Sequence, residues 1–245
     1  MTGLRRPVVR WTDLGRLPYD AAWALQRRLV AERKAGEGVD RLLLVEHDPV
    51  ITLGRRARPE HLLATPEQLA ARGIATHAVE RAGDVTYHGP GQLVAYPILD
   101  LRAHRRDVRW YAGALLECVA RVLGAYGLAC YARGGVETGV WLGRPGDGRH
   151  EKVAALGVRI EQWVTYHGVA LNVDPDLGAF ALIVPCGLPH ARPASMTEAL
   201  GRPLSVAEVR PAFVAAFADV FGAELLPDPT LRPEGRRAPV EVDPT

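Results

Sequence analysis

Apolar residues recur along this chain at two spacings, and the short runs bounded by turn residues predict strands. The predicted strands are 8–14, 41–46, 50–53, 74–80, 92–97, 128–132, 138–142, 153–161 and 164–173. A turn at His47-Asp48-Pro49 is expected to join the second and third of them. Residues 81–91 hold three glycines and a proline, and this composition predicts a loop.

Helical spacing of apolar residues predicts helices at 18–34, 66–72, 107–126 and 205–221. Pro18 suits the start of the first helix, Asp107 is expected to cap the third, and Ser205 opens the last. Many strands between helices, with several antiparallel hairpins among them, predict an α+β fold. A single domain is expected over 1–226, and the proline- and charge-rich residues 227–245 predict a loosely ordered tail.

Composition narrows the class of protein. The chain has 245 residues, 48% of them apolar, and a net charge of +2, which is too small to predict nucleic-acid binding. Without a membrane-length apolar run or an apolar stretch behind Arg5 and Arg6, a cytoplasmic protein with reduced thiols is expected. Two arginine clusters are either solvated faces or a patch that steers an acidic partner: Arg55, Arg56 and Arg58, and Arg102, Arg105, Arg106 and Arg109.

Arginine makes up 28 of the 30 basic residues, and the two lysines are Lys34 and Lys152. Lys34 lies at the polar end of a predicted surface helix, where either side chain would serve. Lys152 opens the segment Lys152-Val-Ala-Ala-Leu-Gly-Val-Arg-Ile160, which is typical of a half-buried strand. A lysine can be tuned by burial and can exchange a proton, whereas arginine cannot. Lys152 is therefore either a solvated charge or a functional ammonium group.

Three segments combine polar residues with glycine. They are Arg81-Ala-Gly-Asp-Val-Thr-Tyr-His-Gly-Pro-Gly-Gln92, Thr165-Tyr-His-Gly-Val-Ala-Leu-Asn172 and Ile183-Val-Pro-Cys-Gly187. In the first, glycines allow the backbone to approach a ligand closely; the alternative is an ordinary turn. In the second, a His-Gly step begins an apolar strand and indicates either a cleft wall or a hydrogen-bonded core histidine.

The third segment is predicted to place Cys186 at the end of an apolar strand, in a turn exposed enough for the thiol to react. Lys152 is the candidate cation that would favour the thiolate, and the alternative is an unreactive turn cysteine. Cys118 and Cys130 lie in apolar segments and are expected to be inert core thiols. None of the three cysteines shows metal-type pairing, so no metal site is predicted.

Together these blocks resemble the lipoyl(octanoyl) transferases, which move an octanoyl group from acyl carrier protein to lipoyl domains. The family pattern is close to Arg-Gly-Gly-x-x-Thr-Tyr-His-Gly-Pro-Gly-Gln, Lys-Ile-Ala-Ala-x-Gly, Thr-x-His-Gly-x-Ala-Leu-Asn and Pro-Cys-Gly, in that order over roughly residues 40 to 200. Ala82 replaces the second glycine of the first block, and Ala194-Ser-Met196 replaces Thr-Ser-hydrophobic after the cysteine. An insert at 144–150 is expected to lengthen a hairpin before Lys152.

The resemblance implies the fold of the biotin and lipoate protein ligase superfamily, a mixed, largely antiparallel sheet packed with helices. It implies a Cys186 nucleophile activated by Lys152, support from His167 and Asn172, no metal and no ATP or other cofactor. The acyl pocket would be lined by three segments: Arg81, Ala82, Gly83, Asp84, Val85, Thr86, Tyr87 and His88; Ala155, Leu156 and Gly157; and Gly168, Val169 and Ala170. Small residues leave a groove for an eight-carbon chain, with each buried methylene contributing roughly 0.8 kcal/mol.

The implied partners are acyl carrier protein as octanoyl donor and, as acceptors, the lipoyl domains of 2-oxoacid dehydrogenases and glycine cleavage proteins, with no nucleic acid or membrane partner. The sequence leaves two alternative functions open. An ATP-dependent lipoate or biotin ligase would need a nucleotide-phosphate loop but no cysteine nucleophile. A non-catalytic binding protein or amidotransferase relative would retain the pocket without acyl-enzyme chemistry.

Overall fold

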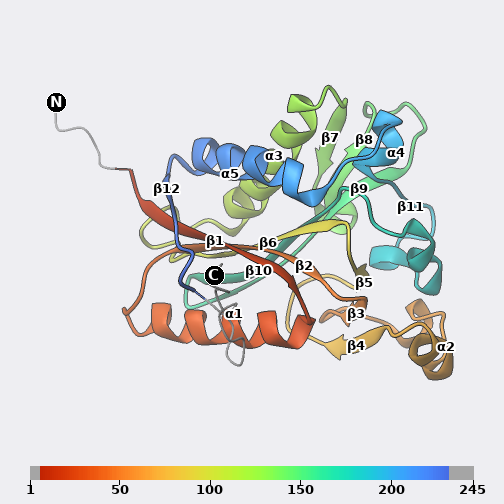
Figure 1. Cartoon of the computed structure of the whole chain (residues 1–245), viewed down its shortest axis with the longest axis horizontal. Helices are drawn as coiled ribbons and strands as arrows, with labels where there is room; N and C mark the ends of the chain where they lie inside the picture. Colours follow the sequence, from red (N-terminus) through yellow and green to blue (C-terminus); the bar gives the residue numbers. More distant parts are fainter. Residues whose placement is uncertain (1–5, 232–245) are drawn as a thin grey trace, which may run out of the picture.

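The computed structural model describes residues 6–231, which form a large sheet, a small sheet and the helices that cover them (Figure 1). The strands of the large sheet are β1 (Val8–Leu17), β2 (Arg41–His47), β6 (Gln92–Ile98), β7 (Cys130–Arg133), β8 (Gly139–Leu142), β9 (Glu151–Glu161), β10 (Val164–Asn172), β11 (Arg192–Pro193) and β12 (Glu224–Pro227). Their order is β12-β1-β2-β6-β10-β9-β8-β7, with β11 paired to β9. Neighbours from β2 to β7 are antiparallel, whereas β1 is parallel to both β2 and β12. The mixed, largely antiparallel sheet of the predicted α+β fold is confirmed.

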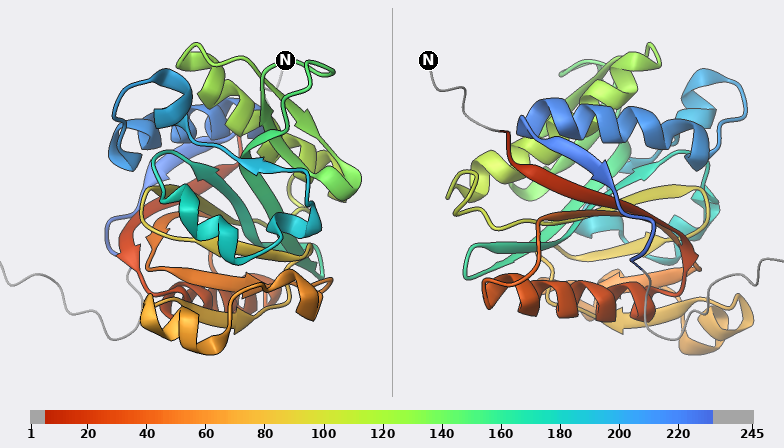
Figure 2. Two further views of the ribbon diagram at one scale, coloured as in Figure 1. Left: turned by 90° about the vertical axis from the view of Figure 1, so that its right-hand side faces the viewer. Right: turned by 60° about the vertical axis from the view of Figure 1, so that its left-hand side comes forward.

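Helices cover both faces of the large sheet, which explains why its central strands β6 and β10 are buried at every position. Helix α1 (Tyr19–Lys34) lies on one face, and α3 (Val108–Ala125) and α5 (Val206–Phe221) lie on the other (Figures 1 and 2). Because successive side chains of a strand point to opposite faces, Leu42 and Leu44 of β2 pack in the core beneath α3 and α5. Leu43 and Val45 pack in the core beneath α1. The large sheet is thus packed on both faces, and some of its strands also line the cavities described below.

The small sheet lies beside this layer and has the order β4-β3-β5. Its strands are β3 (Val50–Leu53), β4 (Ala75–Ala78) and β5 (Val85–His88). Ile51 and Val85 pack against Phe180 and Ile183, which arrive from a distant part of the chain. The remaining elements are short: η1 (Pro59–His61), α2 (Pro66–Ala71), η2 (Gly135–Glu137), η3 (Leu177–Leu182), η4 (Pro185–Gly187) and α4 (Met196–Leu200).

The predicted helix starts are confirmed at atomic detail. The Asp107 carboxylate accepts a hydrogen bond from the Trp110 amide at 2.9 Å and caps α3. Ser205 caps α5 within a capping box completed by Glu208. Pro18 directly precedes α1. The 144–150 insert lies in the connection between the antiparallel strands β8 and β9, as predicted.

Two sequence predictions need correction. The predicted loop at 81–91 contains strand β5, because four residues suited to a strand stand between the turns made by Gly83 and Gly91, whose φ angles are 93° and 85°. The predicted strands β2 and β3 and the turn that joins them are confirmed, and the two strands belong to different sheets. Cys186 does not end a strand, because the apolar segment before it forms 3-10 turns that pack on the small sheet.

The predicted tail is described only in its first residues. Pro227 pairs with Trp11 as the last residue of β12. Asp228 is buried, accepts a hydrogen bond from Thr12 through its carbonyl oxygen and forms an ion pair with Arg41 at 2.7 Å. Residues 232–245 of the tail, and Arg5 at the other terminus, lie outside the described residues. In the described part of the chain, no helix is both long enough and apolar enough to span a membrane.

Candidate active site

Two adjacent cavities lie between the large sheet, β5 and the turn η4. We call the first the histidine cavity, because His88 and His167 line it; its empty space, including a part open to solvent, is about 610 Å³. We call the second the lysine cavity, because Lys152 lines it; its empty space, including a part open to solvent, is about 390 Å³. Four residues line both, and they are Thr86, Ala155, Ala170 and Cys186. The shared residues place the Cys186 thiol at the junction of the two cavities.

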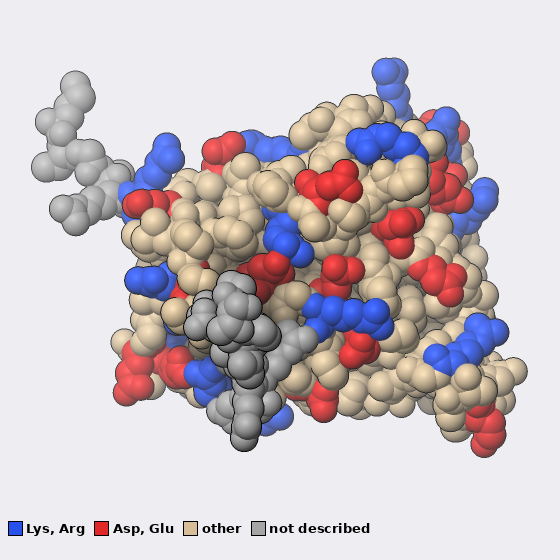
Figure 3. All heavy atoms as spheres, in the orientation of Figure 1, with Lys and Arg blue, Asp and Glu red and all other residues tan. Residues whose placement is uncertain are grey.

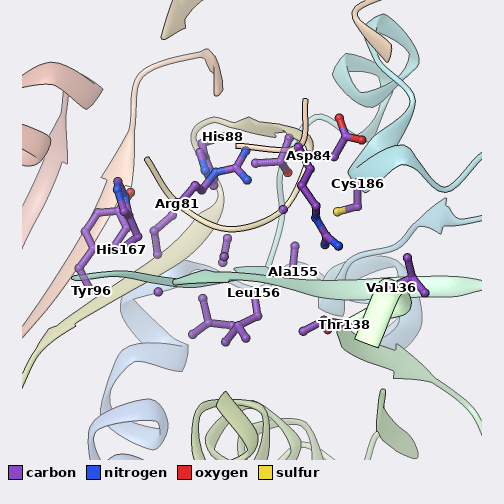
Figure 4. Close-up of a pocket in the computed structure, with 18 of the residues that line it drawn as sticks. Arg81, Asp84, His88, Tyr96, Val136, Thr138, Ala155, Leu156, His167 and Cys186 are labelled. Atoms are coloured by element: carbon purple, nitrogen blue, oxygen red, sulfur yellow. The ribbon is translucent and has the colours of Figure 1, made fainter. Parts of the chain in front are cut away.

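Cys186 is held in an uncommon backbone conformation. Its φ and ψ are 57° and 18°, and the following Gly187 also has a positive φ of 68°. A left-handed conformation costs a non-glycine residue about 1–3 kcal/mol, so the surrounding contacts must enforce it. The sulfur points into the histidine cavity (Figure 4). By contrast, burial raises the pKa of both Cys118 and Cys130 and favours their neutral thiols, which agrees with inert core cysteines.

Lys152 reaches the lysine cavity through a β-bulge. In a regular strand, Lys152 and Ala155 would point to opposite faces, because side chains alternate. The register of β9 against β8 shifts between Ala154, which lies opposite Val140, and Lys152, which lies opposite Trp141. This irregularity lets both side chains face the same cavity.

The amino group of Lys152 is closely confined. Lys152 is buried at 6% exposure, and its Nζ lies 5.4 Å from the centroid of the Trp141 ring. The same indole belongs to an apolar cluster that includes Cys186. A β-carbon on Gly139 would lie 2.4 Å from Cε of Lys152, so the absence of a side chain at Gly139 makes room for the lysine.

The wall of the histidine cavity is built by the predicted small residues in paired register. In the pairing of β9 with β10, Gly157 lies opposite Gly168. The next two pairs are Leu156 with Val169 and Ala155 with Ala170. A β-carbon on Gly168 would lie 1.9 Å from the backbone carbonyl oxygen of β6, so the strands can approach only with glycine there. These residues give the cavity a narrow and mostly apolar floor (Figure 4).

The Arg81 side chain joins the glycine-rich segment to strand β3 of the small sheet. Its side chain is buried and donates hydrogen bonds to the carbonyl oxygen and hydroxyl of Thr52 at 2.7 and 2.9 Å. It passes close to Gly54, where a β-carbon would lie 2.7 Å from Nη1. No ion pair with a carboxylate is formed by Arg81 within residues 6–231. Burial lowers the pKa of Arg81, and its proximity to Tyr19 and Cys186 opposes that effect.

Buried aromatic and imidazole groups close the end of the histidine cavity away from Cys186, where Figure 4 shows Tyr96 and His167. Burial is the main cause that lowers the pKa of both His88 and His167 to about 3. His88 Nδ1 lies 3.0 Å from the Gln92 amide oxygen, and His167 Nδ1 lies 3.5 Å from the Tyr19 hydroxyl. Both histidines are therefore neutral at physiological pH, and their imidazoles line the cavity without charge.

Most of the predicted site residues meet at these cavities. Those that line one or both are Arg81, Gly83, Asp84, Thr86, Tyr87, His88, Lys152, Ala155, Leu156, Gly157, His167, Gly168, Val169, Ala170, Asn172 and Cys186. Two predicted residues lie elsewhere. Val85 points into the core of the small sheet and lines neither cavity. Ala82 uses its amide to bind the Val158 carbonyl oxygen and lines neither cavity.

Several lining residues were missed by the sequence predictions. They are Tyr19, Val94, Tyr96, Phe180, Ala191, Pro193 and the residues Gly135, Val136 and Thr138. None belongs to a recognisable motif, and each reaches the cavities through long-range packing. Arg56 also lines the histidine cavity, and its membership of an arginine cluster was the only local signal. Among the described residues, no group of three or more histidine, cysteine, aspartate or glutamate side chains is arranged to hold a metal ion.

Comparison with known proteins gives consistent matches over most of the chain. The model of the lipoyl protein ligase A/B catalytic domain matches residues 18–218. A protein named octanoyltransferase from Chloroflexus aurantiacus is 50% identical over 212 residues, which cover 86% of this chain and 93% of that protein. Another octanoyltransferase, from Solibacter usitatus, is 48% identical over 219 residues and covers 89% and 96% of the two chains.

Solved structures show the same fold at low sequence identity. A bi-partite lipoate protein ligase from Thermoplasma acidophilum, described with its E2 lipoyl domain, has a TM-score of 0.71 and 18% identity, with 91% of this chain and 88% of that chain covered. Lipoate-protein ligase A bound with ATP has a TM-score of 0.70 and 17% identity, with 91% and 90% covered.

Proposed function

The chain belongs to the lipoyl protein ligase A/B catalytic-domain family and is an acyltransferase, and we propose that it transfers octanoyl groups through a thioester on Cys186. The donor is octanoyl–acyl carrier protein and the acceptor is a lysine of a lipoyl domain, in 2-oxoacid dehydrogenases or glycine cleavage proteins. The observation that carries this proposal is that Cys186 and Lys152 line one cavity although 34 positions separate them. We expect this reaction to take place in the cytoplasm and to require neither ATP nor a metal.

The first half-reaction forms the acyl-enzyme. Lys152 takes the proton of the Cys186 thiol, and the thiolate attacks the thioester carbonyl carbon of the donor. The carrier sulfur leaves, takes the proton back from Lys152 and departs as a thiol. Lys152 lines the same cavity as Cys186, and the buried guanidinium of Arg81 interacts electrostatically with Cys186. The octanoyl chain then occupies the apolar floor of the histidine cavity.

Backbone hydrogen bonds limit which amide groups near Cys186 can stabilise the transient oxyanion. The Gly187 amide already donates to the Val184 carbonyl oxygen at 2.9 Å, so it is not free to bind an oxyanion. Gly157, the other glycine considered from sequence, lines the histidine cavity but lies opposite Gly168 in the antiparallel β9–β10 ladder, so its amide is engaged as well.

In the second half-reaction, an amine of the lipoyl domain attacks the octanoyl thioester and Cys186 leaves as a thiolate. Lys152, neutral after the first half-reaction, accepts a proton from the attacking nitrogen. His88 and His167 are poor alternatives, because burial lowers the pKa of each to about 3. One thioester replaces another at little cost, and the final amide makes the transfer favourable.

The two arginine clusters differ in their position, because only the first has a member that lines one of the two cavities. Arg102 and Arg105 are paired with Asp100 and Asp107 at 2.8 and 3.0 Å. Arg55 and Arg56 are exposed and form no ion pair within residues 6–231, and Arg56 lines the histidine cavity. Basic and acidic groups are interspersed over the face shown in Figure 3, so we assign carrier steering to the local cluster at the cavity.

Glutamine at Arg55 and Arg56 should therefore lower kcat/KM for octanoyl–acyl carrier protein and flatten its dependence on salt. The matched double variant at Arg105 and Arg106 should leave both unchanged. Equal effects of the two double variants would count against docking at the cavity.

Intact-mass measurement tests the acyl-enzyme itself. Wild-type protein mixed with octanoyl–acyl carrier protein should gain one octanoyl group, which hydroxylamine removes. Cys186→Ala should gain none, while Cys118→Ser and Cys130→Ser should be labelled like wild type. A requirement for ATP in the complete transfer, or a hydroxylamine-sensitive adduct on Cys186→Ala, would contradict the proposal.

A further inference from the structure

The second half-reaction leaves one proton unassigned. The side chain of an acceptor lysine has a pKa of about 10.4, so only roughly 1 in 2,500 is a free amine at pH 7. The ammonium must lose one proton before its nitrogen can attack, and the tetrahedral adduct must lose a second. Lys152 can accept only one of them. A second group near Cys186 is therefore needed to receive the acceptor as a cation.

One carboxylate stands where this cation would arrive. Among the described residues that line the two cavities, Asp84 is the only aspartate or glutamate. A negative charge beside the nucleophile opposes the Cys186 thiolate, so the first half-reaction gives no reason for it. Figure 4 shows Asp84 at the Cys186 end of the histidine cavity, away from His167. A carboxylate here suits an incoming ammonium group.

Asp84 is joined to a histidine that the sequence motifs did not indicate. His61 Nδ1 lies 2.7 Å from Oδ2 of Asp84, and both side chains are largely buried, at 17% and 11% exposure. The pair lies against the turn that carries the nucleophile. A β-carbon on Gly187 would lie 2.6 Å from Oδ2 of Asp84 and 3.1 Å from Cε1 of His61.

The backbone fixes this arrangement from both sides. The Val184 amide donates to the His61 carbonyl oxygen at 2.8 Å, and Leu62 forms a β-bridge with Ile183. On the other side, Oδ1 of Asp84 accepts from the Val85 amide at 2.7 Å. The His61 ring makes no hydrogen bond through Nε2 within residues 6–231, and Nε2 is not among the fully buried polar atoms. This nitrogen is placed to exchange protons with solvent.

We propose that Asp84 binds the ammonium of the acceptor lysine and, with His61, removes its first proton; this deepens the proposed function and rests on it. The proton passes from the ammonium to the Asp84–His61 pair and on to solvent through His61. The lone pair of the amine then attacks the thioester carbonyl carbon. As the carbon–sulfur bond breaks, the electron pair stays on Cys186, and Lys152 takes the second proton. Asp84 is a catalytic residue in this step, and His61 positions it.

The test separates the two half-reactions and uses two nucleophiles. Octanoyl-enzyme is prepared from octanoyl–acyl carrier protein, freed of carrier, and mixed with a lipoyl domain or with hydroxylamine, which is uncharged near pH 7. In Asp84→Asn, acyl-enzyme formation and hydroxylamine cleavage should change no more than a few-fold. Transfer to the lipoyl domain should slow at least 100-fold, with a higher KM. Asp84→Glu should recover part of the rate, and Glu60→Gln, an exposed neighbour of His61, should behave as wild type.

His61→Gln should lower the rate of transfer to the lipoyl domain but leave KM unchanged, because the carboxylate that binds the ammonium remains. If Asp84→Asn transfers to the lipoyl domain at the wild-type rate, or slows the reactions with both nucleophiles equally, the proposal is overturned. If the wild-type protein forms no octanoyl-enzyme, the proposed function itself fails and this step fails with it.

Discussion

Replacing Lys152 by arginine separates the two roles that a cation beside Cys186 can have. Arginine keeps the positive charge but cannot release a proton in a protein. It also brings two more heavy atoms into a space where one added carbon, on Gly139, would already lie 2.4 Å from Cε of Lys152. General acid–base catalysis contributes roughly 10²- to 10⁴-fold. Lys152→Arg is therefore expected to slow octanoyl-enzyme formation about 10³-fold, which corresponds to about 4 kcal/mol of activation free energy.

Single-turnover formation of the octanoyl-enzyme, followed by intact mass after rapid quenching, measures this rate. Alkylation of Cys186 by iodoacetamide measures the thiolate separately, since it needs no proton acceptor. The alkylation rate should fall only a few-fold in Lys152→Arg, and much further in Lys152→Met, which removes the charge. Thermal unfolding of each variant shows whether the buried site still folds.

The only other lysine provides the control. Lys34 is partly exposed and forms an ion pair with Glu161 at 3.3 Å, a contact that arginine can also make. Lys34→Arg should acylate at the wild-type rate. If a folded Lys152→Arg protein also acylates at the wild-type rate, proton transfer by Lys152 is refuted and only its charge is needed.

Three further predictions concern the cavity and the sheet. Ala170→Leu adds three carbons to a wall of both cavities, and at about 0.8 kcal/mol per displaced methylene it should lower kcat/KM for octanoyl donors roughly 50-fold while sparing butanoyl donors. Gly168→Ala should lower the free energy of unfolding by about 3 kcal/mol in urea titrations, because its β-carbon would lie 1.9 Å from a backbone oxygen, whereas Gly113→Ala, with open space around it, should not destabilise the protein. Stability should be highest above pH 6.5 and fall below it. His88 and His167 have pKa values of about 3 in the folded protein and about 6.5 in the unfolded chain. Each histidine should therefore lower the free energy of unfolding by about 1.4 kcal/mol between pH 7.5 and 5.5, and a free energy of unfolding that does not change over this range would contradict their neutral state.

The parts of the fold that follow from local chemistry could be predicted from the sequence. The caps Asp107 and Ser205 act within three residues of the helices that they begin, so their effect is visible in a short window. Strand β5 was missed because glycines on both sides of it indicated a loop, although those glycines make the turns that bound the strand. The short strands β2 and β3 were found, but their separation into two sheets depends on tertiary contacts.

The candidate site divides in the same way. Motif residues such as Cys186 and His167 were identified from sequence, yet Tyr19 and Tyr96, which help to close the histidine cavity, were not. Those two side chains come from different elements and carry no motif, because their position results from packing across the sheet. His61 was missed for the same reason. Its relation to Asp84 depends on a β-bridge between segments about 120 residues apart.

The position of Lys152 shows most clearly why a residue pattern is not yet a site. Strict alternation would place Lys152 and Ala155 on opposite faces of β9, and then the ammonium would point away from the cavity that Ala155 lines. The bulge opposite Trp141 shifts the alternation of side chains between Lys152 and Ala155, and the missing side chain of Gly139 leaves space for the lysine stem. The lysine therefore lines the same cavity as Cys186 because of two features of β8 and its pairing. Neither feature would be needed for a lysine that only carried charge on the surface.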